Sequence, residues 1–182
     1  MDSKTYFEII QSNISNGNGI FTIKLNPENE VYEGHFPNEP ISPGVCNINT
    51  IKECAEKMGA DKNVAAFVLP LGATIHMDGT AIYQCVATVF MATCAGVDLT
   101  LTQMIMVVAI ATLSAIGTAG TPGAGVIMLT MVLTTLGIPV DYIGLIIAVD
   151  RLFDMGRTTM NITGDIVGSL CVTKWENGKL NS

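Results

Sequence analysis

Five polar side chains near the C-terminal end of this 182-residue chain have types and spacing that suit chemistry. They are Asp150, Asp154, Arg157, Asn161 and Asp165. Placed on a helix at about 100° per residue, they fall within a sector about 80° wide over roughly four turns. The opposite side of the same helix is mostly apolar. The pattern therefore predicts a helix that carries one hydrated, polar stripe.

The predicted stripe combines a cation, carboxylates and a carboxamide. An arginine can hold a carboxylate through two parallel hydrogen bonds, and a nearby aspartate can bind an ammonium group. A further aspartate, together with backbone carbonyl oxygens, suits a hard cation such as Na⁺. These groups together fit an acidic amino acid bound with a cation. The alternative is that Asp and Arg pair only with one another and hold helices together.

The surrounding sequence changes in character along the chain. Residues 1–62 contain 14 charged side chains, whereas residues 63–182 contain only 11. The first stretch is typical of a water-soluble protein and the second of a membrane protein, in which ionisable groups face a cavity and carry function. The whole chain has 9 basic and 16 acidic residues and a net charge of −7, which excludes a nucleic-acid-binding surface.

Apolar runs interrupted by a glycine-rich segment predict an unusual helical element. The runs cover residues 64–75, 81–97, 104–119, 123–138 and 142–149. Residues 117–125 contain four glycines and one proline, which break a helix. Short apolar helices on both sides of such a segment predict a re-entrant hairpin that lines a cavity. The alternative is two short helices joined by a surface loop in a soluble protein.

Three motifs, Gly72–Thr80, Gly117–Gly125 and Asp150–Asp165, carry a resemblance to a known family. Over residues 64–176 the chain resembles the C-terminal part of the sodium:dicarboxylate (glutamate-type) symporter family. The resemblance implies that the motifs form an unwound transmembrane segment, the tip of a re-entrant hairpin and the substrate-binding helix. It also implies sodium as the coupling ion, no other cofactor, a homotrimer, and a multi-pass position in the lipid bilayer of the cell inner (plasma) membrane.

The resemblance further implies a substrate site for an acidic amino acid or dicarboxylate. Arg157 would bind the side-chain carboxylate of the substrate, and Asp154 would bind its amino group. Additional substrate contacts are implied for Asn161, Thr80, Thr118 and Gly125.

Sodium ligands are implied by the same resemblance. Asp165 and Asp78 would supply carboxylates. The remaining ligands would be backbone carbonyls of Gly72, His76 and Asn161, and Thr74 together with hairpin carbonyls. The family usually has Asn where this chain has His76, so a sodium contact from that side chain is not expected to carry over.

The earlier stretch contains a second specific motif, the run GHFPNEPISPGV from Gly34 to Val45. Over residues 6–58 the chain resembles the start of a hot-dog-fold 3-hydroxyacyl-(acyl-carrier-protein) dehydratase. In that family His35 would be the catalytic base, a role that suits an imidazole. Its acidic partner would fall at Asn49, which cannot do this work, and Glu53 lies one turn later. The alternative is that His35 is a buried, hydrogen-bonded loop residue.

Local patterns predict the elements of this earlier stretch. Residues 19–25 alternate as a half-buried strand does, and residues 46–58 place apolar side chains on one helical face. Residues 5–12 form a short, mixed apolar segment that is compatible with a helix.

Neither resemblance covers a complete protein, so the expected fold is a mixed chimera. Residues 1–58 are expected to be an incomplete α+β hot-dog fragment, and 59–63 the junction. Residues 64–182 are expected to be an all-α membrane fragment with a re-entrant helical hairpin and a polar-striped transmembrane helix.

Three functions follow as hypotheses. The first is a fragment of a sodium-coupled aspartate/glutamate-type or dicarboxylate symporter. It is expected to be inactive alone, because the earlier helices, the first hairpin and the trimer scaffold are missing. The second is a dehydratase-like enzyme of fatty acid synthesis, and the third is a gene fusion without activity.

Overall fold

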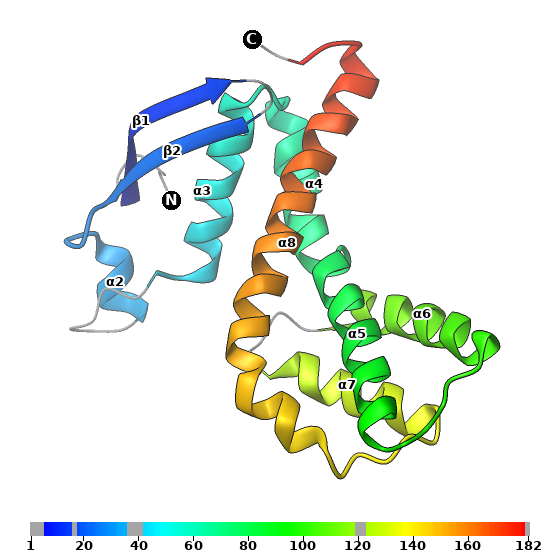
Figure 1. Ribbon diagram of the computed structural model, residues 1–182. Helices are drawn as coiled ribbons and strands as arrows, with labels where there is room; N and C mark the ends of the chain where they lie inside the picture. Colours follow the sequence, from blue (N-terminus) through cyan, green and yellow to red (C-terminus); the bar gives the residue numbers. More distant parts are fainter. Residues whose placement is uncertain (1–5, 16–17, 36–41, 119–122, 181–182) are drawn as a thin grey trace. The chain divides into compact units, whose positions relative to one another are not determined.

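The computed structural model describes residues 6–15, 18–35, 42–118 and 123–180, without the side chains of residues 33–35. This part of the chain is mostly helical and contains one two-stranded sheet (Figure 1). It divides into two compact units: unit 1 comprises residues 1–70 with 166–182, and unit 2 comprises residues 71–165.

Unit 1 begins with two antiparallel strands followed by two helices. Their bounds are β1 Phe7–Ser15, β2 Asn18–Leu25, α2 Glu30–His35 and α3 Gly44–Lys57. The predicted strand at 19–25 and the predicted helix at 46–58 are confirmed by β2 and α3. The prediction of a helix over 5–12 is wrong, because the backbone from Phe7 onward pairs with β2 instead.

Aromatic side chains form the first core of unit 1. Tyr6, Phe7, Tyr32 and Cys46 are buried together, so that β1, α2 and α3 share one apolar centre. The Tyr6 hydroxyl also hydrogen-bonds the Ser42 hydroxyl. Burial of these large rings is the main source of stability for so small a sheet.

A second core of unit 1 joins α3 to α4 (Lys62–Ile75) and to the end of α8 (Ile143–Asn177). Its buried members are Ala55, Ala60, Ala65 and Leu69. Nearby, the backbone N–H of Asp61 donates to the buried Thr173 hydroxyl at 2.9 Å. Residues 59–63, where a junction is predicted, therefore lie within this packed region of unit 1.

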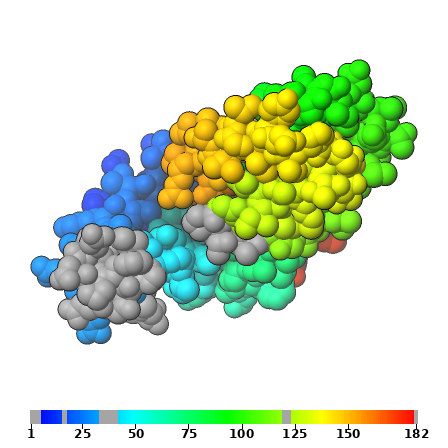
Figure 2. Space-filling model, turned by 90° about the horizontal axis from the view of Figure 1, so that it is seen from below, coloured from blue at the N-terminus to red at the C-terminus, as the bar shows by residue number. Residues whose placement is uncertain are grey.

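Unit 2 contains the end of α4, the first part of α8, and three helices between them. These are α5 Asp78–Cys94, α6 Leu101–Ile116 and α7 Ala124–Thr135. The buried side chains of Met91, Leu129, Leu133 and Ile146 join α5, α7 and α8 in one core. Figure 2 shows α7 and the start of α8, both in yellow shades, packed together.

The helices α6 and α7 flank the predicted tip at 117–125. A capping box between Thr100 and Gln103 starts α6, and Gly123 precedes α7 with a φ of +82°, which favours glycine. Residues 119–122 of the tip lie outside the described residues. The break between two short apolar helices is therefore present, and its depth in a membrane is a separate matter.

Large apolar side chains cover much of the outside of unit 2. Leu101, Ile105 and Leu113 on α6 and Ile127 on α7 are all exposed. Within the described residues, one helical stretch, 62–94, is long and apolar enough to cross a membrane, while α6 and α7 are apolar but shorter. Such a surface is typical of a protein that contacts lipid or another protein.

Candidate functional site

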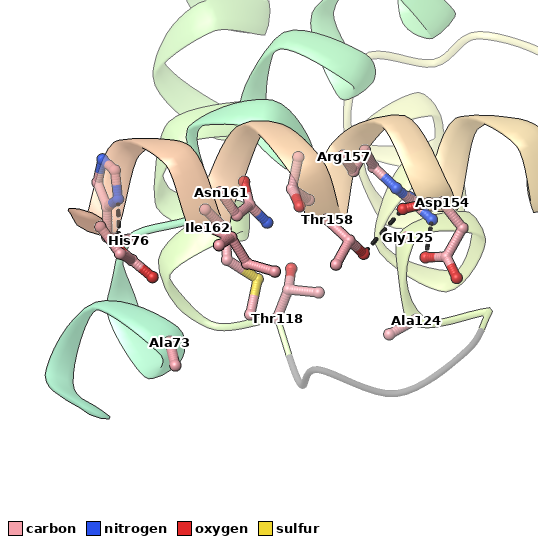
Figure 3. Close-up of a pocket in the computed structure, with 13 residues that line it drawn as sticks. Ala73, His76, Thr118, Ala124, Gly125, Asp154, Arg157, Thr158, Asn161 and Ile162 are labelled. Carbon is pink, nitrogen blue, oxygen red and sulfur yellow. Dashed lines mark hydrogen bonds and ion pairs between the residues drawn. The ribbon is translucent and has the colours of Figure 1, made fainter. Parts of the chain in front are cut away.

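A pocket of about 280 Å³ lies within unit 2, beside the polar stripe of α8 (Figure 3). Predicted site residues from three parts of unit 2 line it: His76, Thr80, Thr118, Gly125, Asp154, Arg157, Asn161 and Asp165. Gly72, Thr74 and Asp78 are not among the lining residues. The structure thus brings together side chains that are up to about ninety residues apart in the sequence, as the contact between His76 and Asp165 shows (|i−j| = 89).

The stripe is built as the helical periodicity predicts. Asp154, Arg157 and Asn161 project from one side of α8 toward the pocket in Figure 3. Their helix exposes Leu152, Phe153 and Met155 elsewhere. The polar groups are therefore separated from the apolar surface by the geometry of a single helix.

Arg157 is the most enclosed charge in this pocket, with a side chain that is only 6% exposed. Its Nη2 donates to Asp154 Oδ1 at 2.8 Å and lies 3.5 Å from Asp150 Oδ1. Its guanidinium carbon stands 4.4 Å from the centre of the Tyr83 ring, an attractive cation–π contact. These contacts fix the plane of the guanidinium.

One end of this guanidinium lacks an acceptor. Nη1 of Arg157 is buried and has no hydrogen-bond partner among the described residues. A Cβ added at Gly125 would overlap the guanidinium, so α7 approaches Arg157 as closely as only glycine allows. A buried N–H of a cation without an acceptor is costly, and a carboxylate bound beside it would remove that cost.

Two residues of this surrounding were not predicted. Tyr83 packs on Arg157, and its hydroxyl lies 3.4 Å from Asp150 Oδ1. Thr158 lines the pocket and donates to the carbonyl of Asp154 at 2.9 Å. Thr158 falls at about 80° on the same helical wheel, just beside the stripe, so the periodicity could have found it. Tyr83 lies one turn after Thr80 on α5, and that spacing is its only signal.

A second pair lies at the other end of the stripe. His76 Nδ1 is 2.8 Å from Asp165 Oδ1, and the Asp165 side chain is 8% exposed. His76 and Met77 are the non-helical residues between α4 and α5. The Gly72 carbonyl, predicted as a sodium ligand, accepts a hydrogen bond from the His76 backbone at 2.8 Å.

Other predicted sodium ligands converge near the start of α5. The backbone N–H of Gly79 donates to Asp78 Oδ1 at 2.8 Å and to Asn161 Oδ1 at 2.9 Å. Two oxygens within about 3 Å of one nitrogen lie close together, which is the donor type that a hard cation needs. Thr74 lies exposed on α4. Within the described residues, no group of three or more His, Cys, Asp or Glu forms a metal cluster.

The hairpin residues contribute from the break between α6 and α7. Thr118 is buried, and its hydroxyl donates to the Ser114 carbonyl at 2.7 Å. Gly125 sits in the first turn of α7 against Arg157. The break therefore delivers one hydroxyl and one close backbone segment to the pocket.

The predicted dehydratase residue cannot be placed in the same way. His35 ends α2, and its side chain lies outside what the structure describes, as do residues 36–41 of its motif. Asn49 and Glu53 both lie on α3. Their relation to the His35 imidazole stays a prediction.

Comparison with known proteins separates the two parts of the chain. The model of the sodium:dicarboxylate symporter family matches residues 48–175, and that of the ApeI dehydratase family matches residues 11–68. The chain is 43% identical over 141 residues to "Excitatory amino acid transporter 3" of Mus musculus, covering 77% of this chain and 27% of that protein.

Two further relatives agree with this result. The chain is 48% identical over 120 residues to "Excitatory amino acid transporter 1" of Rattus norvegicus, covering 66% of this chain and 22% of that protein. It is 45% identical over 127 residues to an "Excitatory amino acid transporter" of Caenorhabditis elegans, covering 70% and 25%. The chain thus spans about a quarter of the length of the curated relatives it matches.

Proposed function

The chain belongs to the sodium:dicarboxylate symporter family, and from that premise we propose that unit 2 carries the binding site of a sodium-coupled symporter for acidic amino acids. The observation that carries this proposal is Arg157, a buried guanidinium held at Nη2 and lacking an acceptor at Nη1 among the described residues. An acidic side chain is the ligand whose charge and geometry complete it.

The neighbouring groups divide the rest of the substrate between them. Arg157 binds the side-chain carboxylate, and Asp154 accepts hydrogen bonds from the amino group. Asn161 and Thr80 supply further polar contacts, and Thr118 and Gly125 add hairpin contacts. All of these residues line the one pocket, which supports the assignment. A carboxylate at position 154 favours an amino acid over a simple dicarboxylate, since only the former has an ammonium group.

Sodium is the proposed coupling ion, in keeping with the family to which the chain belongs. Asp165 and Asp78 supply carboxylates, and the backbone carbonyls of Gly72, His76 and Asn161 supply neutral oxygens. Thr74 acts with carbonyls of the hairpin at a further site. The convergence of Asp78 and Asn161 on one backbone N–H supports the first set.

The membrane arrangement is proposed on the surface of unit 2. Its exposed leucines and isoleucines contact lipid or neighbouring helices of a multi-pass inner-membrane protein, and residues 117–125 form the tip of a re-entrant hairpin. The chain matches about a quarter of its relatives, so we expect it to bind substrate without transporting it. The remaining helices and a homotrimeric scaffold belong to the whole transporter.

Equilibrium binding of radiolabelled L-aspartate to the full chain in detergent tests the proposal. We expect saturable binding in NaCl and none in choline chloride, and loss of binding in Arg157→Ala. Arg151→Ala is the matched control, because Arg151 lies on the same helix but is 79% exposed. Equal binding in both salts, or binding that survives Arg157→Ala, would contradict the proposal.

A second function is favoured by the match of residues 11–68 to the ApeI dehydratase family. We propose His35 as the base that such an enzyme would need to exchange a proton beside a thioester carbonyl. Hydration of a crotonyl thioester by the chain, abolished in His35→Ala, would establish it. Absence of hydration would leave the N-terminal part as a fused segment without this activity.

A further inference from the structure

His76 and Asp165 form a pair that the family resemblance does not account for. The resemblance implies Asn at position 76, whereas the imidazole here contacts the carboxylate at 2.8 Å. Asp165 is nearly buried, while the His76 side chain is 46% exposed. The imidazole therefore lies between the carboxylate and the open side of the pocket that both residues line.

Two glycines make room for this pair. A Cβ added at Gly72 would overlap the Asp165 carboxylate, and a Cβ added at Gly164 would come within 2.5 Å of the His76 ring. The same Cβ at Gly164 would be 3.3 Å from Asp78 Oδ2. The imidazole thus occupies a narrow space between two carboxylates that are both proposed sodium ligands.

The chemistry of this contact opposes a cation at the same oxygen. An imidazole N–H that donates to Asp165 Oδ1 places a partial positive charge where a sodium ion would sit. Sodium would have to displace that hydrogen bond or share the oxygen with it. An imidazole nitrogen is also a ligand for softer metals than Na⁺, so the ring offers little in return.

We propose that His76 is a positioning residue that holds Asp165 through its Nδ1–H and thereby weakens sodium binding at this carboxylate. The inference rests on the proposed role of Asp165 as a sodium ligand. It predicts that any replacement that removes the donor raises sodium affinity. His76→Asn and His76→Ala should both raise it, by about tenfold, the lower end of the effect of residues that orient metal ligands.

The experiment measures sodium affinity of the full chain in detergent from the rise of its unfolding midpoint with NaCl, choline chloride keeping ionic strength constant. His76→Asn and His76→Ala are compared with the natural chain. Cys171→Ala serves as the control, because Cys171 is exposed and lies outside the pocket. A second readout is the imidazole nitrogen signal at pH 8, which is simple to assign because the chain has two histidines.

We expect both His76 variants to bind sodium more tightly, and the hydrogen-bonded Nδ1 signal of the natural chain to shift as sodium is added. Unchanged sodium affinity in both variants would overturn the inference while leaving the proposed sodium site standing. A gain in His76→Asn alone would also overturn it, because the added amide oxygen would then be the cause. Absence of sodium binding in all four proteins would overturn both this inference and the proposed function.

Discussion

The two units of this protein place polar and apolar side chains in opposite ways. Unit 1 buries aromatic rings such as Tyr6 and Tyr32 in the ordinary manner of a water-soluble fold. Unit 2 buries Arg157 and Asp165 around a pocket while Leu113 and Ile127 are exposed. The difference teaches that the solvent expected by each unit, water or lipid, can be read from which side chains it hides.

A charge placed on each surface would break or confirm this comparison most strongly. Leu113 in unit 2 and Val45 in unit 1 are 72% and 70% exposed. We expect Leu113→Glu to impair insertion into liposomes, because a charge within a membrane segment costs roughly 3 kcal/mol. Val45→Glu should leave insertion unchanged. Equal behaviour of the two variants in a flotation assay would contradict a lipid-facing unit 2.

A methyl group at the pocket tests the close approach of α7 to Arg157. Gly125→Ala places a Cβ against the guanidinium, and we expect aspartate affinity to fall roughly 10- to 100-fold, as overpacking costs about 1–3 kcal/mol. Gly144→Ala is the control, because nothing lies within 4 Å of a Cβ at that helical position. Titration of aspartate into both variants makes the comparison, and similar affinities would mean that Gly125 does not shape the site.

Removal of a carboxylate sharpens the assignment of the substrate. Asp154→Asn should weaken aspartate binding by about tenfold relative to succinate, since a charged hydrogen bond contributes about 1.5–3 kcal/mol and succinate has no amino group. Competition of both ligands against labelled aspartate provides the ratio. An equal loss for the two ligands would assign Asp154 to orientation of Arg157 alone.

The smallest expected effect concerns a thiol of unit 1. Burial raises the pKa of the Cys54 thiol, and the neighbouring Glu53 raises it further. A raised pKa leaves less thiolate near pH 8, so Cys54 should react with maleimide severalfold more slowly than the exposed Cys171. Mass spectrometry of partially labelled protein measures both rates. Faster labelling of Cys54 would show that α3 is not packed in solution.

Much of this architecture could be predicted from local sequence. The stripe on α8, strand β2 and helix α3 follow from periodicity, and the break between α6 and α7 follows from glycine and proline. Segment 5–12 was predicted wrongly, because its conformation depends on pairing with β2 and not on its own pattern. The contacts of Tyr83 and His76 could not be predicted, because they join residues far apart in the chain.

The central claim is that Arg157 binds the side-chain carboxylate of an acidic amino acid. The chain has two arginines, so Arg151→Lys leaves Arg157 as the single arginine to label with ¹⁵N. A solid-state NMR distance experiment would use this protein with sodium and aspartate carrying ¹³C in either carboxylate. We predict dipolar coupling between the guanidinium nitrogens and the side-chain carboxylate. Binding of aspartate without that coupling would contradict the claim.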